Sequence, residues 1–279
     1  MNFEGRTLVI ASMHQKEKVI APLLENNLGV KCIVSDQLNT DVFGTFSGDI
    51  SRDKSPLDVL RLKCNTAMDL TNVDLAVASE GSFGNHPMMY FTSADDELLM
   101  LVDRKNKLEI VERELSLQTN LNAAYVNDFE ELKSFADKVL FPSHAICMKD
   151  SEIGGSYLVK GIQSMDQLKR CFHSCINEFN SVYVETDMRA MYNPTRMKVI
   201  EVAAAKLCAK IASKCPNCSF PGYSVQSVLT GLPCSNCHFP TKSTKAFVYQ
   251  CAQCAFEERK NFPHEKTAED PMYCDFCNP

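Results

Sequence analysis

Four C-x-x-C pairs, all after residue 214, constrain this 279-residue chain more than any other feature. They are Cys215/Cys218, Cys234/Cys237, Cys251/Cys254 and Cys274/Cys277. Two thiolates separated by two residues can face one ion from a tight turn, and two such turns complete a tetrahedral four-sulfur zinc site. No secretory leader is visible at the start and the other six cysteines are scattered singly, so a disulfide framework is disfavoured. The sequence therefore predicts two structural zinc sites.

The order of the pairs along the chain does not settle which of them share an ion. Sequential pairing, first with second and third with fourth, is the simplest arrangement, and nested pairing of the outer and inner pairs stays open. Redox C-x-x-C chemistry is the competing interpretation, but four pairs without a thioredoxin-like context disfavour it.

The charge of the cysteine-rich segment bears on its partners. Residues 215–279 hold five Lys/Arg against six Asp/Glu, and two four-thiolate zinc centres leave the segment near −5. Such a surface repels phosphate backbones, so neither DNA nor RNA is expected as a partner. A structural role or the docking of a protein partner is the expectation for this zinc-ribbon module.

The whole chain has a net charge of −6 and is 45% hydrophobic, which permits a packed core. No apolar run approaches the roughly 18 residues that a membrane span requires. We expect a soluble, cytoplasmic protein with no membrane partner.

Strand-like and helix-like segments alternate before residue 215. Strands are predicted at 6–12, 30–34, 74–79, 98–102, 108–111, 145–148 and 182–185, and helices at 17–26, 128–139 and 165–179 and after Ser55-Pro56 and Asn193-Pro194. Segments 98–102 and 108–111 form a predicted hairpin. This pattern predicts an α/β fold, a layered domain with a mixed central sheet over residues 1–214, followed by a small C-terminal zinc-ribbon module over residues 215–279.

Polar clusters follow three of the predicted strands, where ligands bind in α/β sheets. The first cluster is Ser12, His14, Lys16 and Lys18; the second is Glu80, Ser82, Asn85 and His86; the third is Asp187, Arg189, Thr195 and Arg196, with Glu185 and Asn193. A carboxylate between two basic helix starts is the layout expected for a metal-bound polyphosphate.

Simpler interpretations stand beside this one. Lysines in a first helical turn are often only solvated. Glu80 opens a turn-rich, glycine-containing stretch over residues 80–87 and can simply cap a turn. Asp187 with Arg189 can form a structural ion pair. Arg196 lies in the first turn of a helix, where the helix dipole disfavours a cation, so an anion nearby is expected.

Longer motifs bring in a resemblance to known families. ASMHQKEKVIAPLL, ASEGSFGNHP and ETDMRAMYNPTRM, together with the four C-x-x-C pairs, resemble a bacterial family of unknown function over almost the whole chain. Residues 6–112 and 194–208 also resemble the inosine/xanthosine triphosphatases, which release pyrophosphate from non-canonical nucleotides. That second resemblance implies a phosphate-binding Lys16 or Lys18, a metal-binding Glu80, and Thr195-Arg196 opening the last helix. His14 replaces the asparagine of that family, and the zinc module is foreign to it.

Two hypotheses follow. In the first, the chain is a Mg²⁺-dependent nucleotide pyrophosphatase. Glu80 and Asp187 hold the metal and position water, Lys16 or Lys18 binds phosphate with Arg196 and Arg189, and residues 82–86 border the base or ribose. In the second, the chain is a non-enzymatic adaptor whose ribbons dock a protein partner.

Overall fold

The computed structural model describes residues 3–38 and 54–279. By its internal contacts the chain divides into two compact units, residues 3–207 and residues 208–279, and the division falls inside helix α5 (Pro194–Ala212). The domain boundary expected at residue 214 stays a prediction.

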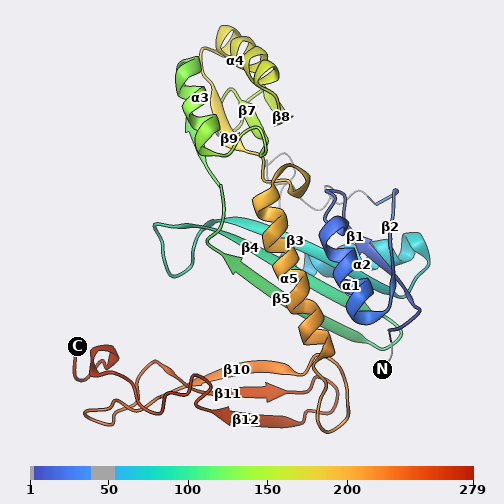
Figure 1. The fold of residues 1–279 in the computed structure, drawn as a ribbon, viewed down its shortest axis with the longest axis vertical. Coiled ribbons are helices and arrows are strands. Elements are labelled where there is room, and N and C mark those ends of the chain that lie inside the picture. Colours follow the sequence, from blue (N-terminus) through green and yellow to red (C-terminus); the bar gives the residue numbers. More distant parts are fainter. Residues whose placement is uncertain (1–2, 39–53) are drawn as a thin grey trace. The chain divides into compact units, whose positions relative to one another are not determined.

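A five-stranded sheet with the order β2-β1-β3-β4-β5 forms the centre of the first unit (Figure 1). Its strands are β1 (Thr7–Ala11), β2 (Lys31–Val34), β3 (Leu75–Asn85), β4 (Ser93–Asp103) and β5 (Leu108–Ser116). Strand β1 pairs in parallel with β2 and β3, whereas β3, β4 and β5 pair antiparallel. The mixed central sheet predicted from the sequence is confirmed.

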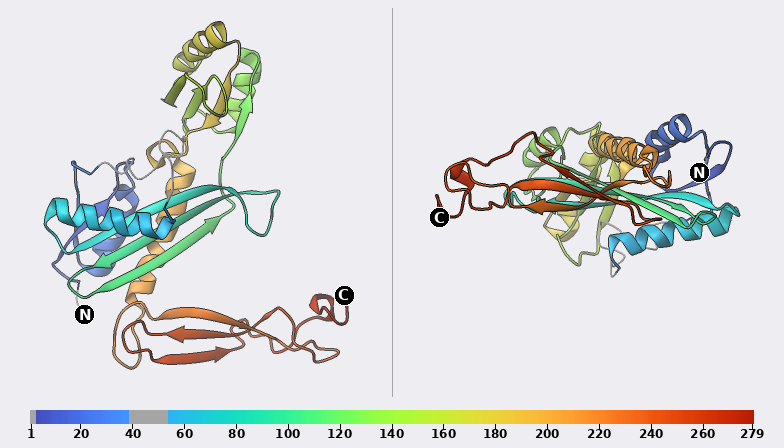
Figure 2. Two further views of the ribbon diagram at one scale, coloured as in Figure 1. Left: turned by 180° about the vertical axis from the view of Figure 1, so that it is seen from behind. Right: turned by 90° about the horizontal axis from the view of Figure 1, so that it is seen from below.

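Helices cover both faces of this sheet (Figure 2). Helix α2 (Pro56–Thr71) lies on one face, where Leu60 and Cys64 pack against Ala76 and Met100 in a continuous core. Helix α1 (Glu17–Leu28) and α5 lie on the other face. Two predicted helix starts are confirmed by their capping bonds, because the Ser55 hydroxyl accepts from the amide of Asp58 and the Asn193 side chain accepts from that of Arg196.

A second sheet, which the sequence analysis did not separate from the first, follows β5. It has the order β6-β9-β7-β8 and is antiparallel throughout. Its elements are β6 (Ala123–Tyr125), β7 (Ile146–Lys149), β8 (Leu158–Ile162) and β9 (Tyr183–Thr186), with helices α3 (Phe129–Lys138) and α4 (Met165–Phe179). The predicted strands at 145–148 and 182–185 therefore pair with each other, and a core of its own joins this sheet to α3 and α4.

The length of β3 corrects a further expectation. The sequence predicts that this strand ends at Ser79 and that the glycine- and serine-containing residues after it form turns. In the structure β3 continues to Asn85, because β4 pairs with it over its whole length. Strand β1 pairs with β3 only as far as Ala78, so the stretch from Ser79 to Asn85 has a partner on one side and borders a cavity on the other.

The second unit contains a three-stranded antiparallel sheet, β10 (Ser224–Thr230), β11 (Thr244–Gln250) and β12 (Glu257–Asn261). The C-x-x-C pairs lie before, between and after these strands. In the part of the chain that the structure describes, no helix is long and apolar enough to cross a membrane.

Candidate anion-binding cavity and metal centres

The eight paired cysteines form two groups of four. One group is Cys215, Cys218, Cys251 and Cys254, and the other is Cys234, Cys237, Cys274 and Cys277. The first C-x-x-C pair therefore joins the third, and the second joins the fourth. Both the sequential pairing favoured from the sequence and the nested alternative are wrong.

Strand topology explains this alternate pairing. In an antiparallel sheet the chain changes ends with each strand, so pairs separated by one strand lie at opposite ends and pairs separated by two strands meet. The register places the start of β10 beside the end of β11, because Ser224 pairs with Gln250. It likewise places the end of β12 beside the start of β11, because Asn261 pairs with Ala246. Each interval between pairs holds one strand, none of which was predicted from the sequence.

The sulfur atoms have the spacing of a zinc site. Within the first group, Sγ of Cys215 lies 3.7 Å from that of Cys254, and Sγ of Cys218 lies 3.6 Å from that of Cys251. Four sulfurs at about 2.3 Å from a tetrahedral ion are separated by roughly 3.8 Å, so the residues fit zinc. Asn217 donates a side-chain hydrogen bond to Cys254 Sγ and thereby lowers the pKa of this thiol to about 6, which favours the thiolate that a metal needs.

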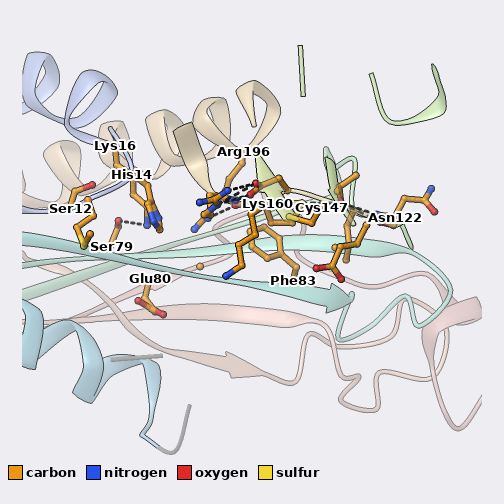
Figure 3. Close-up of a pocket in the computed structure, with 18 of the residues that line it drawn as sticks. Ser12, His14, Lys16, Ser79, Glu80, Phe83, Asn122, Cys147, Lys160 and Arg196 are labelled. Carbon is orange, nitrogen blue, oxygen red and sulfur yellow. Dashed lines mark hydrogen bonds and ion pairs between the residues drawn. The ribbon is translucent and has the colours of Figure 1, made fainter. Parts of the chain in front are cut away.

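The first unit contains a cavity of about 560 Å³ lined by residues of both of its sheets (Figure 3). Eight residues of the three predicted clusters line it: Ser12, His14, Lys16, Glu80, Glu185, Asp187, Arg189 and Arg196. The three polar clusters identified along the sequence therefore contribute to one cavity.

Six residues of these clusters are not among those that line this cavity, and one of them, Asn193, caps helix α5 instead. Lys18 is exposed and donates to Gln15, while Ser82 and Asn85 are exposed on β3. The ring of His86 accepts hydrogen bonds from two backbone amides of its own turn. Thr195 lies against His144, with 2.9 Å between its hydroxyl and Nε2 of the ring.

Lys16 and Ser12 lie where β1 gives way to α1. The Lys16 ammonium is almost completely buried and donates to the Ser79 hydroxyl at 2.9 Å. Burial, and then the positive charges of Arg196 and Lys63, lower the pKa of Lys16 to about 7. Ser12 is 5% exposed, and its hydroxyl has no hydrogen-bond partner among the described residues. The Lys16 ammonium and the Ser12 hydroxyl can therefore donate hydrogen bonds to a ligand in this part of the cavity, and the nearby positive charges favour a ligand that is an anion.

Lys63 and Glu80 form the opposite corner, beyond the other face of β3. Lys63 Nζ donates to Glu80 Oε2 at 2.5 Å, and both side chains are largely buried. Lys63 comes from the buried stripe of α2, between Leu60 and Cys64. A lysine on the buried, apolar face of a helix indicates a site residue, and this signal for Lys63 was present in the sequence.

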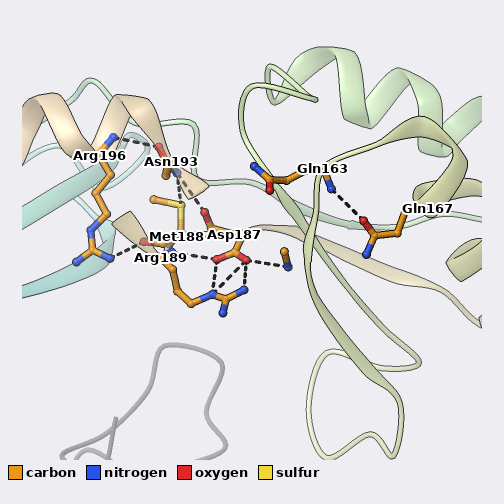
Figure 4. A network of polar contacts seen from close by, with 8 residues as sticks. Gln163, Gln167, Asp187, Met188, Arg189, Asn193 and Arg196 are labelled. Atoms are coloured by element: carbon orange, nitrogen blue, oxygen red, sulfur yellow. Dashed lines mark hydrogen bonds and ion pairs between the residues drawn. The ribbon is translucent and has the colours of Figure 1, made fainter. Parts of the chain in front are cut away.

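Arg196 is held in place on several sides. It is 1% exposed, Nε donates to Glu97 Oε1 at 2.6 Å, and Nη1 donates to the carbonyl of Met188 at 2.5 Å (Figure 4). Its guanidinium lies 4.9 Å from the centre of the Phe83 ring. Glu97 is thus an anion of the kind that the helix-dipole argument called for, and it lies 99 residues away in sequence.

Asp187 and Arg189 form the ion pair that the sequence analysis held as the simpler interpretation (Figure 4). The Asp187 carboxylate accepts from the Arg189 amide and guanidinium and from the Gly161 amide. Asp187 is buried, and both of its oxygens already have donors, so its geometry favours holding Arg189 over binding a metal.

Several cavity residues were not identified from the sequence. They are Lys63, Asn122, Cys147 and Lys160, together with Glu97 behind Arg196, whereas Phe83 falls within the 82–86 stretch that was expected to border the base or ribose. The second sheet contributes Cys147 and Lys160, and no local pattern relates these residues to the first sheet.

Comparison with known protein families places the chain. A family model described as a domain of unknown function, DUF6671, matches residues 63–279, which is most of the chain. The chain belongs to this family. For this DUF6671 chain the match includes both cysteine groups, Glu80 and Arg196, and begins at Lys63, after Lys16. No curated protein matches, and the comparisons give no support to the resemblance to inosine/xanthosine triphosphatases.

Proposed function

We propose that the chain is a Mg²⁺-dependent nucleoside triphosphate pyrophosphatase acting on non-canonical nucleotides, with two structural zinc centres. The observation that carries this proposal is the convergence of Lys16, Lys63 and Arg196 on one cavity at the carboxyl end of β1. Three cations line this cavity together with the buried Ser12 hydroxyl, which has no hydrogen-bond partner in the described part of the chain, and this combination matches the needs of a polyphosphate.

Lys16 supports this assignment because its positive charge is costly at this buried position beside other cations. A phosphate beside its ammonium would offset the repulsion from Arg196 and Lys63 and would favour protonation. Binding of a polyphosphate should therefore be accompanied by proton uptake near neutral pH.

Glu80 is the carboxylate that we assign to the metal. It lines the cavity beside Lys63, and Mg²⁺ in such sites takes one or two carboxylates together with substrate phosphates. When bound, the ion would neutralise charge on the phosphate oxygens. Lys63 would hold Glu80 in position, while Lys16 and Arg196 would bind the phosphates. Asp187 is assigned to holding Arg189 instead of the metal.

Phe83 is the residue that we assign to the nucleoside end. It is the one member of the 82–86 stretch among the cavity-lining residues, and one guanidinium already lies over its ring. A half-buried aromatic ring beside a cavity offers a surface on which a base can stack.

The test is pyrophosphate release from a panel of nucleoside triphosphates, including the inosine and xanthosine forms, with Mg²⁺ present. We expect release by the parent protein and a loss of at least a hundredfold in Glu80→Gln. Glu130→Gln, on the exposed surface of α3, is the matched control and should retain activity. No release across the panel, or undiminished release by Glu80→Gln, would contradict the proposal.

A second candidate function is the docking of a protein partner by the zinc module. It is favoured by the Phe239 and Phe276 rings, which stack at 4.8 Å beside the second cysteine group and are both more than half exposed. Met272 and Tyr273, on the short segment that precedes Phe276, are exposed as well. A partner that binds the parent protein but not Phe239→Ser/Phe276→Ser, at unchanged zinc content and without nucleotide turnover, would favour this role.

A further inference from the structure

Two carboxyl groups that the proposed function does not use, those of Asp95 and Glu97, are completely buried in the first unit. Both side chains are 0% exposed, and both lie on the same face of β4 because they are two residues apart in a strand. The register places Asp95 opposite Phe83 and Glu97 opposite Gly81. The Glu97 carboxylate contacts Arg196.

Three of their four oxygens have no hydrogen-bond partner in the part of the chain that the structure describes. They are Oδ1 and Oδ2 of Asp95 and Oε2 of Glu97. The remaining oxygen, Glu97 Oε1, accepts from Arg196. Buried carboxylates without donors are costly, and two ionised carboxylates side by side are costlier still. A proton on one of them removes a negative charge and supplies a donor to the other.

We propose that Asp95 and Glu97 share one proton, carried by Asp95, and that this proton keeps the cation of Arg196 available to phosphate anions in the cavity. Glu97 is the ionised partner because the Arg196 guanidinium donates to it. Asp95 is then a positioning residue that acts through Glu97 and Arg196. The effect on anion binding through Arg196 rests on the proposed function, whereas the shared proton does not.

The surroundings of Asp95 favour its protonated form. Burial, and next the charge of Glu97, raise the pKa of Asp95 to about 8. Arg196 from α5 and Lys16 from the start of α1 act in the opposite direction, and Asp96 adds a smaller effect that favours the proton. At neutral pH the Asp95, Glu97 and Arg196 side chains thus have no net charge, and above the pKa of Asp95 they carry a negative one.

The proton can be tested without any ligand. Infrared spectra of the zinc-loaded full chain, with and without ¹³C-labelled aspartate, report the carbonyl stretch of a protonated carboxylic acid. We expect one label-sensitive band of this kind at pH 6 that disappears by pH 10 and is absent from Asp95→Asn. Absence of the band at pH 6 would overturn the proposal. A third metal equivalent, bound by the parent protein and missing from Asp95→Asn, would also overturn it by placing a cation there.

Calorimetric titration with tripolyphosphate at pH 6.5 and pH 9 tests the effect on the cavity. Asp95→Asn keeps a donor for Glu97 but cannot ionise, and it retains Lys16. The parent protein should therefore lose on the order of tenfold more affinity between the two pH values than Asp95→Asn does, which is the effect of one added charge nearby. Equal losses would overturn the link to anion binding. Absence of tripolyphosphate binding with the infrared band present would instead refute the proposed anion site while leaving the shared proton in place.

Discussion

Replacement of Lys16 by methionine should stabilise the protein while it weakens anion binding. Lys16 is buried beside Arg196 and Lys63, and its pKa falls from 10.5 to about 7. At about 1.4 kcal/mol per pKa unit, keeping this amine charged at pH 6.5 costs the folded state roughly 4 to 5 kcal/mol. Loss of the hydrogen bond to Ser79 offsets about 1 kcal/mol of that gain. The net expectation for Lys16→Met is a gain of roughly 3 to 4 kcal/mol in the free energy of unfolding.

The pH dependence gives this prediction its sign. Between about pH 7 and pH 10.5 the unfolded parent chain binds more protons at Lys16 than the folded one, so the stability of the parent rises with pH in this window. Methionine does not titrate. The advantage of Lys16→Met should therefore shrink to less than about 1 kcal/mol at pH 10.

Urea unfolding followed by far-ultraviolet circular dichroism, at constant free zinc, measures both values in a chain without tryptophan. Lys18→Met is the matched control, because Lys18 is exposed and its ammonium donates to the nearby Gln15 side chain, and it should change stability by less than about 0.5 kcal/mol. The reasoning is refuted if Lys16→Met is less stable than the parent at pH 6.5, or if its advantage is the same at both pH values. Tripolyphosphate binding by Lys16→Met should be at least roughly tenfold weaker than by the parent.

Two further predictions concern the buried ion pair of Glu97 with Arg196 and the zinc ligands. A Cβ at Gly81 would lie 2.5 Å from Oε1 of Glu97, which pairs with Arg196. Gly81→Ala should therefore lower the free energy of unfolding in urea by about 1–3 kcal/mol and weaken anion binding. The control Gly84→Ala, with open space around its Cβ, should lower it by less than about 1 kcal/mol. Under alternate pairing, the double variant of Cys215 and Cys251 to serine should retain one zinc per chain by atomic absorption, and the double variant of Cys215 and Cys234 should lose both. The opposite result would restore sequential pairing.

The sequence by itself determined the local elements of the fold. Side-chain periodicity located most strands, and the capping residues Ser55 and Asn193 marked two helix starts, because both signals act over a few residues. The C-x-x-C spacing likewise identified all eight metal ligands, since each pair is a self-contained turn. The polar residues after β1, such as Lys16, were identified because strand ends in α/β sheets meet at one edge.

Only the tertiary structure decided how these elements pair. The glycines at 81 and 84, which follow Glu80, indicate a turn locally, yet pairing with β4 keeps this stretch extended. The partner of Arg196 is Glu97 on a distant strand, and each cysteine pair meets the one two strands away. Strand order and register fix these contacts. They arise from hydrophobic packing and hydrogen bonding between segments far apart in the chain, and no window of neighbouring residues contains that information.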